Sequence, residues 1–418
     1  MRHPTMSPTL SSPGTRPLLA SSVLARLPLA MFSIALLVHA QRLTGSFSVA
    51  GAYAIASAVS SPALGRWVDR HGQTHVLVPA AGVTALTLVA NGLLPAGTSP
   101  VVLVVLGAAA GALTPPLAAC VRTLLPGLVS DPGELERLFA LESTVLELTF
   151  VFGPVFALGL GQLWSPGAAL ALSGLVMLAG TLLFAAHPLS RAWRPSAEAP
   201  RTRGGAMGSP AIRTLVLITF GAGALFGATE LAVTAAAHAH HETGLAGPLL
   251  GLWGAGSLLG GIAATRLAGN GAAGSRDLLR LLAALVLTHA VLFVFAGSLL
   301  ALALAITIAG TTIAPTLARI YASVDATAPG GTQTEAFSWL LTASLSGASL
   351  GSAAAGALAQ GGGPATAFAF VAAAGVTTLA LAAIRARRLQ PDASRRPVSP
   401  TRPRPRSLGA EISRTVAP

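Results

Sequence analysis

The chain has 418 residues, of which 53% are hydrophobic, 46 are glycine and only 10% are charged, and its mean hydropathy is +0.70. Soluble domains carry about 25% charged residues, so this composition excludes a soluble protein and predicts one that lies in a membrane. All 26 basic residues are arginine, and the lack of lysine excludes both an ATPase phosphate-binding loop and a retinal Schiff base, which each need one.

Twelve stretches of the chain are apolar and about 20 residues long, the length that a membrane helix needs. In chain order they are 18–40, 46–66, 75–95, 100–121, 139–161, 167–187, 212–237, 246–266, 279–297, 299–319, 336–359 and 365–385. Turn-forming residues separate them, as at Gly361-Gly362-Gly363-Pro364, and only Gly297-Ser298 separates the ninth from the tenth. We therefore expect an all-α integral membrane protein with twelve transmembrane helices.

The first stretch also resembles a secretory signal, with Val38-His39-Ala40 as a candidate cleavage site. Its apolar run of about 23 residues is longer than the 7–15 of a signal core, and Arg26 interrupts it. We therefore expect this stretch to be the first span.

The arginines predict the orientation of the spans, because basic residues in short loops stay cytoplasmic. If both termini are cytoplasmic, the cytoplasmic loops and tails contain every arginine except Arg42 and Arg26, which lies inside the first span. The opposite orientation would reverse this distribution. We expect a multi-pass protein of the cell (plasma) membrane with cytoplasmic N- and C-termini.

The chain repeats itself at half its length. Thr44-Gly45 after the first span recurs as Thr243-Gly244 after the seventh, and Pro116-Leu117-Ala118 in the fourth span matches Pro315-Thr316-Leu317-Ala318 in the tenth at the same offset. The predicted parts are a six-helix bundle over 1–187, a cytoplasmic linker over 188–211, a second six-helix bundle over 212–385 and a disordered basic tail over 386–418. Two parallel repeats are typical of one class of secondary transporters, with the site between the halves.

The loop after the second span reads Gly65-Arg66-Trp67-Val68-Asp69-Arg70-His71-Gly72-Gln73-Thr74. It resembles the G-x-L-a-D-R-x-G-R-[RK] signature of the major facilitator superfamily at Gly65, Asp69, Arg70 and Gly72, although Trp67 replaces the usual leucine and Gln73-Thr74 replace the basic pair. The resemblance implies two bundles related by a pseudo-two-fold repeat and a cytoplasmic contact between them that breaks during transport.

Independently of the resemblance, the residue types in this loop are suited to such a contact. The carboxylate of Asp69 can accept bonds from the free amides of a neighbouring helix N-terminus, and Arg70 supplies a forked donor. The alternative is an ordinary turn that keeps its charges in water. The corresponding second-half loop, Arg266 to Arg280, lacks the aspartate at this spacing, so we expect an asymmetric contact.

A second set of charges recurs in both halves at the cytoplasmic ends of the spans, namely Arg122 with Glu142 and Arg319 with Glu335. Their recurrence favours an inner gate of exchangeable ion pairs, because surface pairs are worth only about 0–1 kcal/mol and can open. The alternative is that they are helix-end charges at the lipid headgroups.

Three ionisable residues lie inside predicted spans, namely Arg26, Glu147 and Glu230. A charge at the bilayer centre costs at least about 2.5–3.5 kcal/mol, so such residues usually face a cavity and serve function. The resemblance implies that their three spans border a central cavity. Glu147 or Glu230 is then a candidate proton carrier, and Arg26 would pair with one of them or bind an anionic solute. A purely structural ion pair is the alternative.

These features predict a secondary active transporter of a small organic solute that works by alternating access. Gly153-Pro154 in the fifth span resembles a motif of drug/proton antiporters, which favours proton-coupled efflux, although a proline kink is an equal explanation. A proton-coupled or facilitative importer is the alternative, and a non-transporting receptor or scaffold of the same fold is the second. No nucleophile–base–acid constellation indicates an enzyme.

The expected partners are a small-molecule substrate, protons and membrane lipid, and the expected state is a monomer without cofactor. A pI near 11.7 is compatible with nucleic acid, but the hydropathy opposes it. His238, His240, His241 and Glu242 cluster after the seventh span. Neighbouring histidines at a span end more often contact headgroups, so we expect no metal site.

Overall fold

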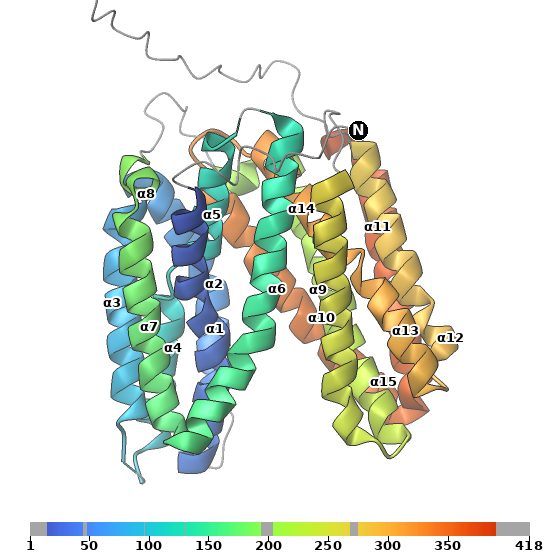
Figure 1. Cartoon of the computed structure of the whole chain (residues 1–418), viewed down its shortest axis with the longest axis horizontal. Helices are drawn as coiled ribbons and strands as arrows, with labels where there is room; N and C mark the ends of the chain where they lie inside the picture. The colour runs from blue at the N-terminus through green and yellow to red at the C-terminus, as the bar shows by residue number, and fades with distance from the viewer. Residues whose placement is uncertain are drawn as a thin grey trace, which may run out of the picture.

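The computed structural model describes residues 15–44, 48–95, 97–129, 131–193, 204–267 and 275–389. These residues are nearly all helical and include no β-strand. The helices stand side by side as two bundles, one from each half of the sequence (Figure 1).

The N-terminal bundle contains six transmembrane helices. They are α1 (Thr15–Thr44), α2 (Ser48–His71), α3 (Gln73–Gly92), α4 (Pro100–Ala112) continued by α5 (Leu117–Leu124), α6 (Pro132–Leu163) and α7 (Pro166–Ala186). Pro115 and Pro116 interrupt the fourth helix between α4 and α5, because proline has no amide hydrogen to donate. The short helix α8 (Pro188–Ala192) follows α7, and the 3-10 turn η1 (Leu125–Gly127) follows α5.

The C-terminal bundle repeats this order. Its helices are α9 (Pro210–Ala239), α10 (Ala246–Leu267), α11 (Ser275–Ala290) continued by α12 (Leu292–Phe295), α13 (Leu299–Gly310) continued by α14 (Ile313–Thr327), and α15 (Gln333–Ile384). Three short 3-10 turns accompany them, η2 (Gly205–Gly208), η3 (Thr243–Leu245) and η4 (Ala386–Leu389).

The helix α15 contains two transmembrane helices. Its 52 residues exceed twice the length that crosses a bilayer, and Gly363 has a φ of 73° that ends one helix and starts the next. The seam predicted at Gly361–Pro364 is therefore confirmed. Nine helical segments of the described chain are long and apolar enough to span a membrane, with α15 counted once. Together with α2 and α6, which have 24 and 32 residues, they form the twelve-helix, two-bundle fold.

Glycines let the helices of each bundle touch backbone to backbone. A Cβ on Gly223 or Gly227 of α9 would overlap a carbonyl oxygen of α15, and a Cβ on Gly256 or Gly260 of α10 would overlap one of the tenth span. No larger side chain fits at these positions, which is the packing that small residues provide in membranes.

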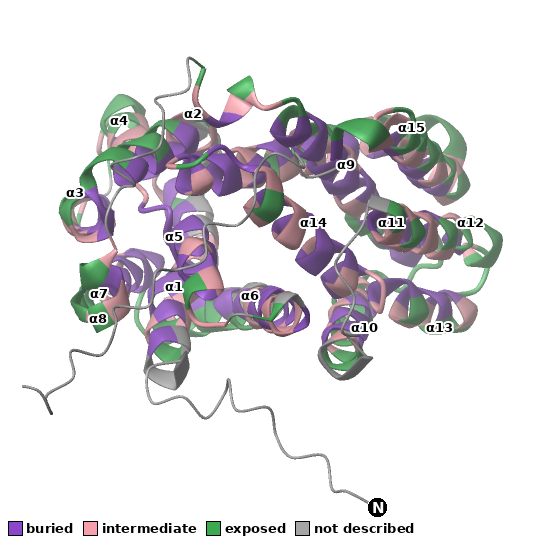
Figure 2. Cartoon of the chain, turned by 90° about the horizontal axis from the view of Figure 1, so that it is seen from above, coloured by how far each residue is buried: buried purple, intermediate pink, exposed green. Residues whose placement is uncertain are grey.

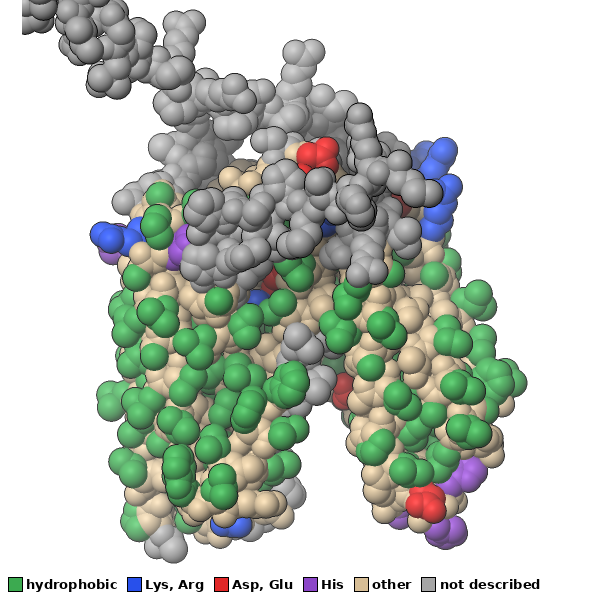
Figure 3. All heavy atoms as spheres, viewed as in Figure 1, with side chains coloured by type: hydrophobic (Ala, Val, Ile, Leu, Met, Phe, Trp, Pro, Cys, Tyr) green, Lys and Arg blue, Asp and Glu red, His purple; other side chains and the backbone are tan. Residues whose placement is uncertain are grey.

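The two bundles share a hydrophobic core at one end only. One buried cluster contains residues of both bundles, such as Phe139 of α6 with Tyr321 of α14 and Phe337 of α15. The other two clusters each lie within one bundle, between residues 31 and 177 or between 225 and 371. We call the shared end the closed end; at the opposite, open end a wide cleft separates the bundles (Figure 3). Seen from above, exposed residues lie around the perimeter and buried residues inside (Figure 2).

Candidate functional site

Asp69, in the last turn of α2, contacts the first turn of α15 across the closed end. Its Oδ1 accepts a hydrogen bond from the amide of Thr334 at 3.1 Å, and its Oδ2 accepts one from the amide of Glu335 at 2.8 Å. The first amides of a helix have no partner inside it, and the helix dipole stabilises an anion there. Asp69 is only 4% exposed. One bundle therefore caps a helix of the other with a buried carboxylate.

The neighbours of Asp69 make this close approach possible. A Cβ on Gly65 would lie 2.8 Å from the carbonyl oxygen of Thr334, so a larger residue would push α15 away. One residue further, Arg66 Nη2 donates to Glu335 Oε1 at 2.6 Å. The Glu335 side chain is 1% exposed and that of Arg66 is 44% exposed, so this ion pair lies at the rim of the contact.

The other motif residues have different positions. Gly72 has a φ of 94° and links α2 to α3, a conformation that favours glycine. Arg70, which the sequence analysis expected to supply the forked donor, is exposed, and Arg66 instead makes the ion pair with Glu335. Arg66 was missed as a site residue, although its place one turn before Arg70 on the same helix was a usable signal.

A second set of polar contacts crosses the closed end between α14 and α6. Arg319 is 2% exposed, and its Nη1 donates to Glu136 Oε2 of α6 at 3.2 Å. Its Nη2 lies 3.7 Å from Asp277, which also pairs with Arg280 at 3.0 Å. Arg319 therefore pairs with Glu136 and Asp277, while Glu335 pairs with Arg66, because α14 faces α6 and the start of α15 faces α2.

Three charged side chains form a buried cluster inside the N-terminal bundle. Arg26 of α1 donates from Nη1 to Glu142 Oε1 of α6, and Arg122 of α5 donates from Nε to Glu142 Oε2 at 2.9 Å. All three are at most 2% exposed. Breaking a buried pair is expensive. The spacing argument placed Arg122 and Glu142 together and the structure adds Arg26, which the sequence analysis expected to pair with Glu147 or Glu230.

Aromatic side chains of the C-terminal bundle cover this arginine cluster. The guanidinium carbon of Arg122 lies 3.8 Å from the ring centroid of Tyr321 and 6.0 Å from that of Phe337. The first distance is a cation–π contact. Arg122 Nη2 is buried and has no hydrogen-bond partner among the described residues. Two arginines and one glutamate leave one positive charge in excess, with an unused donor beneath the other bundle's rings.

The remaining candidates lie elsewhere. Glu230 is exposed on α9, and its carbonyl oxygen accepts the Thr234 hydroxyl at 2.8 Å. Glu147 is a residue of α6, but its side chain lies outside the described residues. In the histidine cluster, His240 Nε2 lies 3.4 Å from the carbonyl oxygen of Ala296. Among the described residues, no group of three or more histidine, cysteine or acidic side chains is placed to hold a metal ion.

Comparisons with known proteins agree with this architecture. A family model described as Major Facilitator Superfamily matches residues 18–318. No curated protein sequence matches the chain.

Several solved structures are similar to the chain over nearly its full length. A bacterial homologue of the iron transporter ferroportin, in an outward-facing state, has a TM-score of 0.69 and 17% identity, covering 88% of this chain and 98% of its own. The E. coli fucose:proton symporter FucP has a TM-score of 0.68 and 15% identity, with 90% and 99% covered. The human organic anion transporter MFSD10 has a TM-score of 0.66 and 15% identity, with 89% and 100% covered. At these identities the likeness is one of fold.

Proposed function

The chain belongs to the major facilitator superfamily and is a multi-pass membrane transporter rather than an enzyme, and on that premise we propose that it exports a small organic solute in exchange for protons. The observation that carries this proposal is the unequal contact between the bundles, which share a core at the closed end and have separate cores elsewhere. A solute in the cleft reaches one side of the membrane. If the closed end parts and the open end closes, the solute reaches the other side. This exchange between two states is called alternating access.

The closed end is the cytoplasmic end in this proposal. The arginines at the end of α2 (Arg66 and Arg70) and at the start of α11 (Arg276 and Arg280) lie there, and basic side chains gather at that end in Figure 3. Arg42, in the last turn of α1, is at the open end. Because basic residues stay cytoplasmic, we take the structure as an outward-facing state in the plasma membrane with both termini inside.

Glu230 is our candidate for the proton carrier. It lies within the apolar span Pro210–Ala239 and is exposed. A carboxylate facing lipid at this depth would be costly, so we assign it to the cleft wall, where it would take up protons from the outside. Proton uptake from the outside while the solute leaves to the outside is antiport. Import with the proton is the alternative.

The arginine cluster supports a solute with an acidic group. When the closed end parts, Tyr321 and Phe337 would leave with the C-terminal bundle, and Arg122 would face the cytoplasm with an unpaired donor and an excess positive charge. An anion from the cytoplasm would then replace the aromatic rings. We propose that Arg122, positioned by Glu142 and Arg26, is the cytoplasmic binding point of an organic anion.

The test is transport into inverted vesicles that are acidic inside, with fluorescein as the organic anion. Wild type should accumulate the dye while the pH gradient lasts. Glu230→Gln should lose accumulation but keep exchange of dye for dye, because exchange needs no proton. Glu242→Gln, at an exposed acid beyond the end of α9, is the matched control and should behave as wild type.

Three outcomes would each contradict a different part of the proposal. Accumulation in the Glu230→Gln variant would remove the proton role of Glu230. Dye that moves only in the same direction as the protons would identify an importer. A protein that moves neither this dye nor other organic anions would favour the receptor or scaffold alternative.

A further inference from the structure

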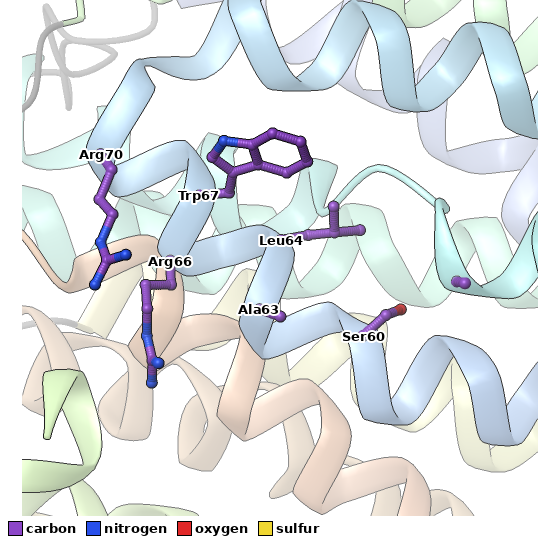
Figure 4. Close-up of a pocket in the computed structure, with 7 residues that line it drawn as sticks. Ser60, Ala63, Leu64, Arg66, Trp67 and Arg70 are labelled. Atoms are coloured by element: carbon purple, nitrogen blue, oxygen red, sulfur yellow. The ribbon is translucent and has the colours of Figure 1, made fainter.

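A groove of about 340 Å³ runs along the outer side of α2, beside α4 (Figure 4). The residues that line it are Ser60, Ala63, Leu64, Arg66, Trp67, Arg70 and Ala112. From Ser60 to Arg70 the groove follows eleven residues of helix, a rise of about 15 Å. Both arginines are at the closed end, and small or apolar side chains continue from them toward the middle of the span.

The groove faces the surrounding membrane. One side of α2 carries Gly65 and Asp69 and packs on α15; on another, the Tyr53 hydroxyl lies 3.3 Å from that of Thr114, just after α4. The stripe between them is exposed, with Val59 75% and Trp67 54% exposed. Large apolar side chains exposed on a membrane helix contact lipid.

The mouth of the groove is positively charged. Arg66 and Arg70 are one helical turn apart, and both are exposed. The Glu335 carboxylate pairs with Arg66, and that of Asp69 is buried on the amides of α15, whereas Arg70 makes no ion pair with a described residue. The exposed positive charge at the mouth is therefore that of Arg70. Among the described residues Arg66 bonds only Glu335, so its other N–H groups can donate to a second anion.

Trp67 indicates the depth at which the groove lies in the membrane. Tryptophan prefers the boundary between hydrocarbon and headgroups, and here it replaces the leucine usual in this motif. Along the chain it lies between Arg66 and Arg70, and it lines the groove together with Leu64 (Figure 4). Along α2 the groove therefore carries two cations and an aromatic ring at the closed end and an apolar surface beyond them, as a lipid carries its phosphate above its acyl chains.

We propose that this groove binds an anionic phospholipid, with its phosphate between Arg66 and Arg70 and an acyl chain along Trp67, Leu64 and Ala63. A free phosphate would use the arginines but not the apolar floor. The lipid also influences the contact between the bundles, because its phosphate competes with Glu335 for Arg66. An anionic lipid thus stabilises the state in which the closed end has parted.

The test uses the full chain in nanodiscs and the fluorescence of Trp67, taken as the difference between wild type and Trp67→Phe. Brominated phosphatidylglycerol should quench Trp67 at about fivefold lower mole fraction than brominated phosphatidylcholine, the preference expected from one basic residue near the lipid. Arg70→Gln should remove this preference. Arg213→Gln, at an exposed arginine in the first turn of α9 at the same end, is the matched control and should retain it.

The proposal is overturned if wild type shows no preference between the two lipids. It is also overturned if Arg213→Gln reduces the preference as much as Arg70→Gln, because the attraction would then belong to the whole surface. Millimolar glycerol phosphate should leave the quenching unchanged, and loss of quenching in its presence would identify a site for free phosphate instead.

Discussion

Replacing Asp69 by asparagine should weaken the closed end and leave each bundle folded. Asp69 bonds two amides of α15 with two oxygens, whereas asparagine has one acceptor oxygen and no charge. The change removes one hydrogen bond to a charged group, worth about 1.5–3 kcal/mol, and the attraction of a carboxylate to the helix N-terminus, worth about 0.3–1 kcal/mol. The total is about 3 kcal/mol, or roughly a 150-fold change in the ratio of closed to parted molecules.

Pulsed electron paramagnetic resonance can measure this ratio. With Cys120 replaced by alanine, spin labels at Ser99→Cys and Thr243→Cys would sit on opposite bundles at the open end, one just before α4 and the other at η3. Wild type should give long distances, because the cleft is open. Asp69→Asn should shift the distribution to shorter distances, as the closed end parts and the open end closes.

Asp131 provides a control of the same chemistry. Its Oδ2 accepts the amide of Glu134 at 2.9 Å, so it caps α6, but within a single bundle. Asp131→Asn should therefore leave the distances unchanged. The reasoning is refuted if Asp69→Asn gives the wild-type distribution, or if Asp131→Asn shifts it equally.

Three further substitutions test neighbouring contacts. Gly65→Ala should part the closed end and slow transport at least tenfold, because its Cβ would lie 2.8 Å from a carbonyl oxygen of α15, whereas Gly82→Ala, with no atom within 4 Å, should transport normally. Glu142→Gln should lower the free energy of unfolding by about 3–5 kcal/mol, as it leaves buried arginines uncompensated, while Glu134→Gln should change it by less than about 0.5 kcal/mol, measured by chemical denaturation in detergent. Arg66→Gln should shift the label distances less than Asp69→Asn, because a half-exposed pair contributes about 0–1 kcal/mol.

The arrangement along the chain could be predicted because the bilayer fixes it. The hydrocarbon thickness sets the length of each span, and the interruptions need residues that end helices. Even the slight seam at Gly297-Ser298 is confirmed, because α13 begins at Leu299 and the hydroxyl of Ser298 accepts the amide of Ala301 at 3.4 Å. The apolar composition of a span and the turn-forming residues at its ends act over a few neighbouring residues, so both can be recognised directly in the sequence.

The partners across the closed end could not be predicted in the same way. The repeat places Arg122 and Arg319 at equivalent positions of the two bundles, which suggested equivalent partners. Arg122 does pair within its bundle with Glu142, but Arg319 reaches across to Glu136. An internal repeat fixes where a residue lies in its own bundle. Which side chain it meets depends on the face that the other bundle presents, and no local pattern contains that information.

The same asymmetry bears on how the closed end would open. On the α2–α15 side the contact is a buried carboxylate on two amides, supported by a glycine that admits the backbone. On the α6–α14 side it is Arg319 with Glu136, whose side chain is 26% exposed and within reach of water. Water can replace a partly exposed ion pair at little cost, but it cannot enter the buried cap before the helices move apart. We therefore expect the bundles to separate first along α6 and α14, with α2 and α15 as the last contact to break.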